Sequence, residues 1–401
     1  MTKVLNILDS SKFLFNFAQN IFEMKILFLV YHGFSEVSGI SKKIHYQVKG
    51  LRENGYEVHL CYYDFDKNGH RCRFVDDEVI KDYGKGAFAG IFQRISYDCI
   101  YDYCRQRNIQ FVYARCFQNA NPFLIRLFKK LKKLGVKSVT EIPTYPYDQE
   151  FVGFPFTTRL SLKVDQFFRH QLSCQMNAIV TFSDAECIFG QRTIRISNGV
   201  DMDSIPLHQY QKPSDGSIHL IGVAEVHYWH GFDRLIAGLG EYYKNVSHPR
   251  QVFFHIVGGV WKSEMYDSIH APGFSELMDK YGIRDKVIFH NQLFGEQLNM
   301  VFNQCCFAIG SLARHRSGIT LIKTLKNREY ATRGIPFIYS EIDSDFEDKP
   351  YVIKALPDES PIDIKKILDF IETHNFNPAE IRSSVENLTW KIQMRRVIEE
   401  A

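Results

Sequence analysis

Short apolar runs alternate with longer amphipathic stretches from Met24 to the end of the chain. Runs rich in β-branched and aromatic residues predict buried strands, and the stretches of helical periodicity between them predict crossover helices. In the first half, the expected strands are 25–31, 56–63, 109–114, 137–142, 177–182 and 193–197. In the second half, they are 217–224, 251–257, 286–290, 305–310, 335–340 and 350–355. This alternation predicts an α/β fold with two doubly wound parallel sheets.

The division of the chain follows from its length and from one polar segment. A chain of 401 residues exceeds the size at which one hydrophobic core usually keeps growing, so two domains are expected. The polar stretch 208–216 follows the last strand of the first half and is the expected linker. We therefore expect domains at 24–205 and 206–380, with a terminal helix at 381–401 that returns to the first domain. Residues 1–23 are expected to be an extension, either upstream of a natural start at Met24 or an added helix.

Composition narrows the class of protein. Hydrophobic residues make up 45% and charged residues 24% of the chain, as in ordinary soluble globular proteins. A net charge of +3 is too small to indicate a nucleic-acid partner. The nine cysteines show neither a C-x-x-C pair nor zinc-ligand spacing, which indicates reduced thiols in a cytoplasm. No apolar stretch reaches the roughly 18 residues that span a bilayer.

The first strand leads into a glycine-containing loop that is suited to an anion. The loop runs from Tyr31 to Ile40, and Gly33 and Gly39 allow backbone N–H groups to approach a ligand at the start of the next helix. Glycines in such turns often serve sterics alone, so this loop is a weak indication by itself. The segment 84–90 imitates a dinucleotide fingerprint, but it has Ala89 in place of the third glycine and follows no strand. A dehydrogenase and a P-loop enzyme are therefore not expected.

The segment 314–337 carries the strongest chemical indication. It leaves the strand 305–310, passes through a basic loop that contains Arg316, and enters a helix that ends at Gly334. A helix N-terminus with Lys326 beside it would hold a diphosphate, and Glu329, one turn later, could accept hydrogen bonds from ribose hydroxyls. The alternative is a solvated basic helix.

The stretch Lys326-Asn-Arg-Glu-Tyr-Ala-Thr-Arg-Gly-Ile-Pro336 resembles the Glu-Ala-x-Ala-x-Gly-x-Pro segment of family-four glycosyltransferases. Other segments resemble landmarks of that family in the same order along the chain: Ser38-Gly-Ile-Ser41, Leu51-Arg-Glu-Asn-Gly-Tyr-Glu-Val58, Ser183-Asp184, Asn198-Gly-Val-Asp201, Trp229-His-Gly-Phe-Asp-Arg-Leu-Ile236, Ile256-Val-Gly-Gly259 and a terminal helix with Trp390. The resemblance covers about residues 24–401. It implies the two-domain GT-B architecture, in which the C-terminal domain binds the nucleotide sugar and the N-terminal domain binds the acceptor.

The resemblance also implies site residues and a reaction. It implies retaining transfer of a hexose type without a required metal or other cofactor. The residues expected to bind the donor are Gly39, His230, Gly258, Arg316, Thr324, Leu325, Lys326 and Glu329. Tyr145 and Tyr147 are expected on the acceptor side, and the expected catalytic residues are Glu329, Lys326 and Asp148.

Three departures from the family pattern bear on catalysis. Family members usually carry two glutamates seven residues apart, but the position of the first is Leu321. Glu225 and His230 stand where the first C-domain loop usually has Arg and Lys, and Glu225 would repel phosphate. The usual acceptor-side histidine is not evident, so Tyr145, Tyr147 or Asp148 is expected in its place.

Together these observations predict a cytoplasmic transferase that builds a bacterial surface polysaccharide, such as a capsule or lipopolysaccharide, from a nucleotide-sugar donor onto a glycan or lipid-linked acceptor. Three alternatives remain: a nucleotide-sugar-binding partner that has lost transfer, an epimerase of the same architecture, and a scaffold that binds no nucleotide. The basic amphipathic segment 123–134 is either a helix packed on the sheet or a peripheral contact with anionic membrane. The three Asp-x-Asp triplets, at 64–66, 201–203 and 343–345, are not expected to bind metal.

Overall fold

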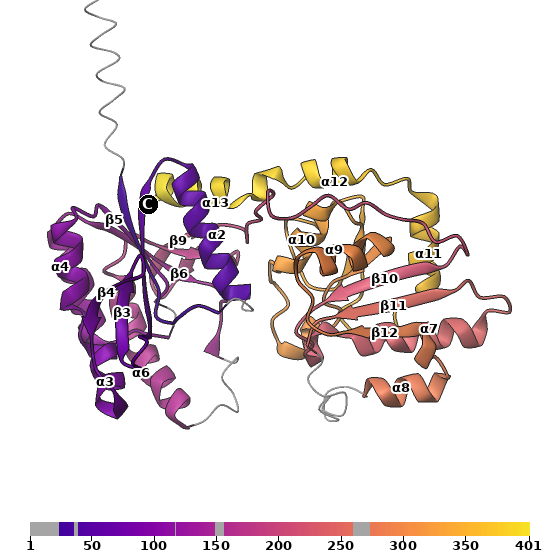
Figure 1. The fold of residues 1–401 in the computed structure, drawn as a ribbon, viewed down its shortest axis with the longest axis horizontal. Helices are drawn as coiled ribbons and strands as arrows, with labels where there is room; N and C mark the ends of the chain where they lie inside the picture. Colours follow the sequence, from indigo (N-terminus) through magenta and orange to yellow (C-terminus); the bar gives the residue numbers. More distant parts are fainter. Residues whose placement is uncertain (1–23, 36–38, 117, 149–155, 260–272) are drawn as a thin grey trace, which may run out of the picture.

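The computed structural model describes residues 24–35, 39–116, 118–148, 156–259 and 273–401. These residues form two α/β domains that lie next to each other, each built on one central sheet (Figure 1). The expectations for residues 1–23 lie outside the described residues. No helix in the described ranges combines the length and the apolar character needed to cross a membrane.

The N-terminal sheet has the strand order β4-β3-β2-β1-β5-β6-β7-β9-β8. Its strands are β1 (Lys25–Leu29), β2 (Glu57–Phe65), β3 (Arg71–Val75), β4 (Glu78–Asp82), β5 (Phe111–Ala114), β6 (Lys137–Ile142), β7 (Ala178–Thr181), β8 (Cys187–Ile188) and β9 (Gln191–Arg195). The strands β2, β1, β5, β6, β7 and β9 are parallel, and each corresponds to a predicted strand. The sequence did not predict the antiparallel hairpin β3–β4 at the edge. The helices of this domain are α2 (Gly39–Glu53), α3 (Gly86–Ile95), α4 (Asp98–Gln106), α5 (Pro122–Lys133) and α6 (Phe156–Ser173).

The C-terminal sheet is entirely parallel, with the order β12-β11-β10-β13-β14-β15. Its strands are β10 (Ile218–Val223), β11 (Val252–Val257), β12 (Val287–His290), β13 (Phe307–Ile309), β14 (Phe337–Tyr339) and β15 (Val352–Lys354). The helices are α7 (Phe232–Asn245), α8 (Phe274–Tyr281), α9 (Gly295–Gln304), α10 (Leu325–Arg333), α11 (Ile364–Thr373) and α12 (Pro378–Ser383), with short 3₁₀ turns η2 (Tyr228–His230), η3 (Arg284–Lys286), η4 (Arg314–Ser317) and η5 (Glu386–Leu388). All six predicted strands are present, and their order is that of a nucleotide-binding Rossmann sheet.

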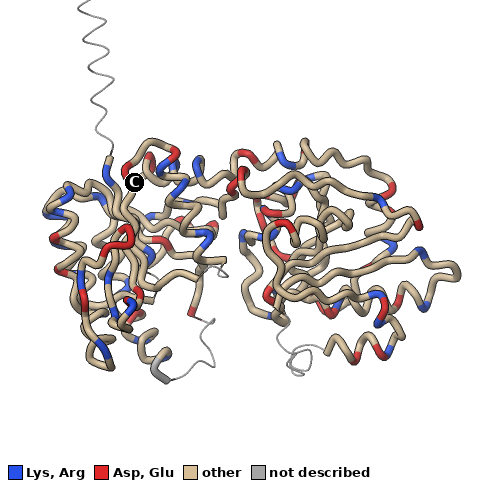
Figure 2. The backbone as a smooth tube through the Cα atoms, in the orientation of Figure 1, with Lys and Arg blue, Asp and Glu red and all other residues tan. Residues whose placement is uncertain are grey.

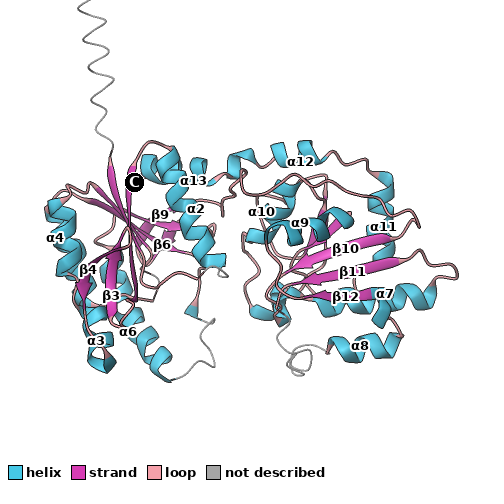
Figure 3. Ribbon diagram, viewed as in Figure 1, coloured by secondary structure: helices cyan, strands magenta, loops and turns pink. Residues whose placement is uncertain are grey.

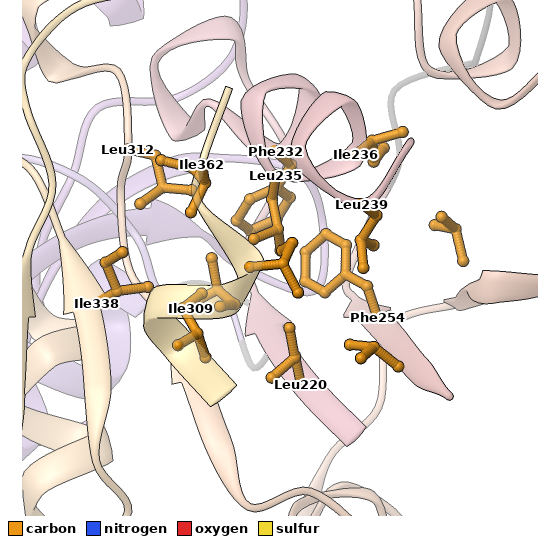
Figure 4. Packing of buried hydrophobic residues seen from close by; sticks show 14 of the residues in the cluster. Leu220, Phe232, Leu235, Ile236, Leu239, Phe254, Ile309, Leu312, Ile338 and Ile362 are labelled. Carbon is orange, nitrogen blue, oxygen red and sulfur yellow. The ribbon is translucent and has the colours of Figure 1, made fainter. Parts of the chain in front are cut away.

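Each domain has its own hydrophobic core on both faces of its sheet. In the C-terminal domain, Leu220 of β10 and Phe254 of β11 pack against Phe232 and Leu235 of α7 (Figure 4). The opposite face of the same sheet is covered by a second apolar cluster that includes Tyr330 of α10. Separate cores mean that the two domains can move as units around the segments that join them.

The last helix returns to the N-terminal domain. Val200 pairs with Thr389, and the following helix α13 (Trp390–Glu400) packs along α2 (Figure 3). The Trp390 side chain is buried in the core of the N-terminal domain, where Gly199 leaves room for it: a Cβ atom at Gly199 would lie 2.3 Å from the indole ring. Gly50 of α2 allows the backbone of α13 to approach closely, since a Cβ atom there would lie 2.7 Å from the Trp390 carbonyl group. The prediction of two doubly wound domains with a returning terminal helix is therefore confirmed.

Candidate active site

A cleft of about 770 Å³ lies between the domains and is lined by residues from both. It is formed largely by loops that follow the carboxyl ends of the strands, where doubly wound sheets bind ligands. Its size is that of a small-molecule site. Figure 2 shows Lys and Arg positions on both domains along the side where they face each other.

The N-terminus of α10 forms the centre of the C-domain wall. Thr324 precedes the helix in an extended conformation and gives it no side-chain cap, because the Thr324 hydroxyl donates to Glu341 at 3.2 Å. Thr324 and Leu325 both line the cleft. The first backbone N–H groups of a helix have no partner within the helix and carry partial positive charge. This helix end can therefore bind an anionic group in the cleft.

Lys326 lies in the first turn of α10 and lines the same wall. Its Nζ atom is buried and has no hydrogen-bond partner among the described residues. Burial, together with the nearby Arg314 guanidinium, lowers the pKa of Lys326 to about 7, and Glu341 opposes this shift. Arg314 also lines the cleft. Burying an ammonium without a partner costs free energy, and an anion bound at this wall would offset that cost.

Glu329 and Gly258 flank this wall. Glu329 lines the cleft one turn into α10, and its Oε1 accepts hydrogen bonds from Arg333 at 3.0 and 2.9 Å. Gly258 follows β11 with φ of 130°, and a Cβ atom there would lie 1.9 Å from the Ala224 carbonyl oxygen. Only glycine fits this close approach of two loops. Leu321 and Glu225, which both depart from the family pattern, also line the cleft.

The N-domain wall is built around the buried carboxylate of Glu141, at the end of β6. Its Oε1 lies 3.4 Å from Lys43 Nζ and accepts from Arg115 Nε at 3.1 Å. Its Oε2 accepts from the Tyr113 hydroxyl at 2.6 Å and from the Gln47 amide at 2.7 Å. Burial opposes ionisation, but Lys43 and Arg115 overcome it and hold the pKa of Glu141 at about 2. This carboxylate therefore stays ionised and orients both cations.

Of the predicted residues, the structure places Gly39, Gly258, Thr324, Leu325, Lys326, Glu329 and Tyr145 around the cleft. Arg316 does not line it. Both guanidinium ends of Arg316 bind Asp233, at 2.9 and 2.7 Å, and the side chain also pairs with Glu359. This pairing fastens the η4 turn to α7, so the expectation of direct donor contact by Arg316 has no geometric support.

His230 lies behind the cleft wall. It is buried, and its Nδ1 accepts the His227 N–H at 2.9 Å. Burial, together with Lys326 and Arg314, lowers the pKa of His230 well below its usual value. His230 is thus a neutral imidazole beside the cationic pair, and it cannot supply charge to a phosphate.

Tyr147 and Asp148 do not line the cleft either. The Tyr147 hydroxyl is directed inward and donates to Asp165 at 2.6 Å. Asp148 accepts two hydrogen bonds from Arg169, at 2.7 and 3.1 Å, and this pairing lowers its pKa. The geometry therefore gives both residues structural contacts rather than a position beside an acceptor.

The sequence alone did not indicate the cations of the N-domain wall or the role of Arg314. Arg115 directly follows β5, and Glu141 lies at the end of β6. Charged residues at the carboxyl ends of adjacent parallel strands meet at one edge of a sheet, so their positions could have indicated this cluster. Arg314 belongs to the basic loop that the sequence did single out.

The Asp-x-Asp triplets have partners within the protein. Lys49 bonds Asp201 at 2.7 Å and Asp203 at 3.1 Å. Arg328 pairs with both Asp343 and Asp345. Asp66 accepts backbone N–H groups of its own turn. In the described ranges, no three His, Cys, Asp or Glu side chains are grouped to hold a metal ion.

No family model and no curated protein matches this chain, whereas many solved structures do. Sucrose-phosphate synthase from Thermosynechococcus elongatus superposes with a TM-score of 0.60 at 12% identity, over 94% of this chain and 98% of that one. The catalytic domain of starch synthase IV from Arabidopsis thaliana, bound to ADP and acarbose, gives 0.59 at 12% identity over the same shares. A protein assigned as a UDP-N-acetylglucosamine 2-epimerase from Listeria monocytogenes gives 0.50 at 10% identity, over 94% of this chain and 95% of that one. The chain therefore has the GT-B fold, which transferases and epimerases share.

Proposed function

We propose that this protein is a glycosyltransferase that takes a sugar from a nucleotide-diphosphate donor. The observation that carries the proposal is the buried Lys326 ammonium, which has no described partner and lies beside the uncapped N-terminus of α10 in the cleft. The fold neighbours support the assignment because sucrose-phosphate synthase and starch synthase transfer sugars with the same architecture.

The expected mechanism assigns the leaving diphosphate to the C-domain wall. Lys326, Arg314 and the first N–H groups of α10 would stabilise the charge that develops on the diphosphate as the sugar–oxygen bond breaks. Such preorganised donors usually supply the largest single part of catalysis. Glu329 would bind the ribose hydroxyls. We propose that a hexose is transferred with retention, so that the acceptor attacks from the face that the diphosphate leaves.

The N-domain wall, with Tyr145 among its residues, would bind the acceptor. We propose a glycan or lipid-linked acceptor in the synthesis of a bacterial surface polysaccharide, at the cytoplasmic face of the membrane. A peripheral contact with anionic lipid would bring the cleft close to such an acceptor.

A thermal-shift experiment with UDP, GDP, ADP and their sugar conjugates tests the donor site. A ligand at a hundred times its dissociation constant stabilises by about 2.7 kcal/mol, which for a protein of this size raises Tm by roughly 2–4 °C. We expect one nucleotide to give this rise, Lys326→Ala to abolish it, and Lys366→Ala, at an exposed lysine of α11, to preserve it. The absence of a shift with any nucleotide would contradict the proposal.

Leu321 and Glu225 favour a second candidate, a nucleotide-sugar-binding protein that has lost transfer. At Leu321 a hydrocarbon side chain lines the cleft where the resembled family has a carboxylate. This candidate predicts donor binding without release of the nucleotide diphosphate. An epimerase would instead convert the donor sugar to its stereoisomer without any acceptor, and analysis of the products by chromatography separates the three cases.

A further inference from the structure

The N-domain wall of the cleft holds more positive than negative charge. Lys43 and Arg115 both line the cleft, and their side chains are only 7% and 9% exposed. Glu141 is the one described carboxylate that pairs with them. Two buried cations therefore share a single buried anion.

The bonding around Glu141 shows that this carboxylate cannot satisfy both cations. Its Oε1 serves Lys43 and Arg115, while its Oε2 is already bound to the Tyr113 hydroxyl and the Gln47 amide. Arg115 bonds through Nε alone, and its buried Nη1 has no hydrogen-bond partner among the described residues. An arginine that is nine-tenths buried with an unsatisfied nitrogen is costly unless a ligand completes its bonding.

Lys43 is held in place by neighbours that do not neutralise it. Its Nζ lies 3.6 Å from the centre of the Phe182 ring and 5.7 Å from that of Trp390. Burial lowers the pKa of Lys43 to about 8, with Glu141 opposing the shift and Arg115 adding to it. The aromatic rings hold the ammonium at the wall but carry no negative charge of their own.

From this geometry we infer that the acceptor carries an anionic group, a phosphate or a carboxylate, which binds Arg115 and Lys43 on the N-domain wall. The inference rests on the proposed transfer function and specifies the acceptor that the cleft takes. A planar guanidinium and a point-charge ammonium together match the oxygens of such a group. The Arg115–Lys43 site belongs to the N-terminal domain and is therefore separate from the C-domain wall that contains Lys326.

The test adds candidate acceptors to protein that is already saturated with the stabilising nucleotide diphosphate. Glucose 6-phosphate, glucuronate and neutral glucose are titrated, and the further change in Tm is recorded. We expect at least one of the two anionic sugars to raise Tm and glucose to leave it unchanged. A shift with only one of them identifies the group as phosphate or carboxylate.

Two variants locate the effect. We expect Arg115→Gln to weaken binding of the anionic sugar about tenfold or more, as loss of a hydrogen bond to a charged group implies. Arg107→Gln, at an exposed arginine that ends α4, is the matched control and should leave binding unchanged. If Arg115→Gln fails to fold, Arg115→Lys serves instead: it keeps the charge but loses the planar guanidinium, so it should bind the anionic sugar more weakly than the wild type.

The outcomes separate this inference from the proposed function. A nucleotide shift without any shift from the anionic sugars would overturn the inference and leave the transferase proposal standing. Anion binding that survives undiminished in Arg115→Gln would also overturn it. No shift with any nucleotide would instead contradict the donor site itself.

Discussion

If a nucleotide diphosphate binds beside Lys326, as proposed, its affinity should depend on pH. In the free protein, burial and Arg314 lower its pKa to about 7, so much of the side chain is neutral at pH 8. A bound diphosphate favours the charged form, so binding should take up a proton and raise this pKa. Affinity should therefore fall as pH rises above 7, by at most about tenfold per pH unit. Calorimetry at pH 8 in two buffers of different ionisation enthalpy measures the uptake directly.

The control for this prediction is Lys326→Met, which removes the titrating group while keeping much of its length. The variant should bind the nucleotide more weakly and with little dependence on pH between 7 and 9. A wild-type affinity that stays constant over this range would show that Lys326 does not contact the diphosphate.

Leu321 provides a test of lost or altered catalysis. Its side chain lines the cleft, and its backbone pairs with Ile342, so the position is fixed by the fold. If the missing carboxylate limits transfer, Leu321→Glu should raise turnover about tenfold or more, because a fixed charge near the reacting sugar acts mainly on the transition state. Turnover is measured as the rate at which nucleotide diphosphate is formed, with the donor at a saturating concentration. Leu321→Gln introduces a side chain of the same shape as glutamate but without its charge, and should not raise turnover. An equal rise in turnover in both variants would contradict the electrostatic explanation.

At the scale of elements, α5 shows how one pattern permits two explanations. The predicted amphipathic helix is present, capped by the Asn121 side chain at 3.0 and 2.9 Å from two backbone nitrogens. Its leucines and Phe128 are buried in the core of the domain. The apolar face is therefore unavailable to a membrane, and α5 presents mainly its cations, together with the exposed Phe123 at its start.

The two most exposed large apolar side chains described in the N-terminal domain, Phe88 and Phe167, lie instead on α3 and α6. Phe88 is 76% exposed, Ile91 54% and Phe92 53%, all on α3, while Phe167 of α6 is 71% exposed. Exposed apolar side chains gathered on a helix mark an interaction surface. On α3 they are accompanied by the exposed cations Lys85 and Arg94, a combination typical of a helix that lies on anionic lipid.

We expect the double variant Phe88→Ser/Phe92→Ser to bind vesicles of anionic phospholipid about tenfold or more weakly than wild type, since two large apolar side chains no longer enter the lipid. Co-sedimentation with the vesicles measures this. The control is Leu356→Ser, which removes a side chain that is 68% exposed in the C-terminal domain. Equal binding by both variants and the wild type would rule out α3 as the lipid contact.

The elements that the sequence predicted differ physically from those it missed. Strands buried in the parallel sheets, such as β1 and β5, are largely continuous apolar runs, which the sequence shows directly. The edge strand β9, with the sequence Gln-Arg-Thr-Ile-Arg, is an exception. The hairpin β3–β4 was not predicted, because β3 carries Arg71 and Arg73 at positions where apolar residues would be expected in a buried strand. Arg73 is fully buried, with its guanidinium 3.7 Å from the centre of the Tyr63 ring. Packing of a buried arginine against an aromatic ring does not produce the alternation of apolar and polar residues from which strands are predicted.

The same distinction applies to the site. Lys326 and Glu329 follow from a local motif at a helix start, so the sequence could place them. Arg115 and Glu141 could have been expected to meet from their positions at the carboxyl ends of two predicted parallel strands. The pairing of Arg316 with Asp233 instead depends on a contact between residues 83 positions apart. Such contacts are set by the sheet order and the loop paths, which one sequence does not state.

At the scale of the whole molecule, polar contacts and one helix join the domains. Ser197 donates to Asp345 at 2.6 Å, and Asn198 donates to the Lys323 carbonyl at 2.5 Å, directly beside the cleft. These contacts connect residues 197–198, which follow the last strand of the N-terminal domain, to the C-domain wall. Because the domains have separate cores and meet at polar contacts such as these, we expect the cleft to close when ligands bind.

Trp390 tests how far the returning helix stabilises the molecule. Trp390 is 2% exposed, and its indole fills space in the N-domain core that Gly199 leaves open. Trp390→Ala should therefore lower the free energy of unfolding by about 3–5 kcal/mol, the usual cost of removing a large buried aromatic side chain. Trp390→Phe should cost less, because it refills most of the cavity. Urea unfolding followed by far-ultraviolet circular dichroism measures both changes. The C-domain wall, where the nucleotide is proposed to bind, belongs to the other domain. The rise in Tm expected with nucleotide should therefore persist in folded Trp390→Ala protein. Loss of this rise would show that α13 also controls the position of the cleft walls.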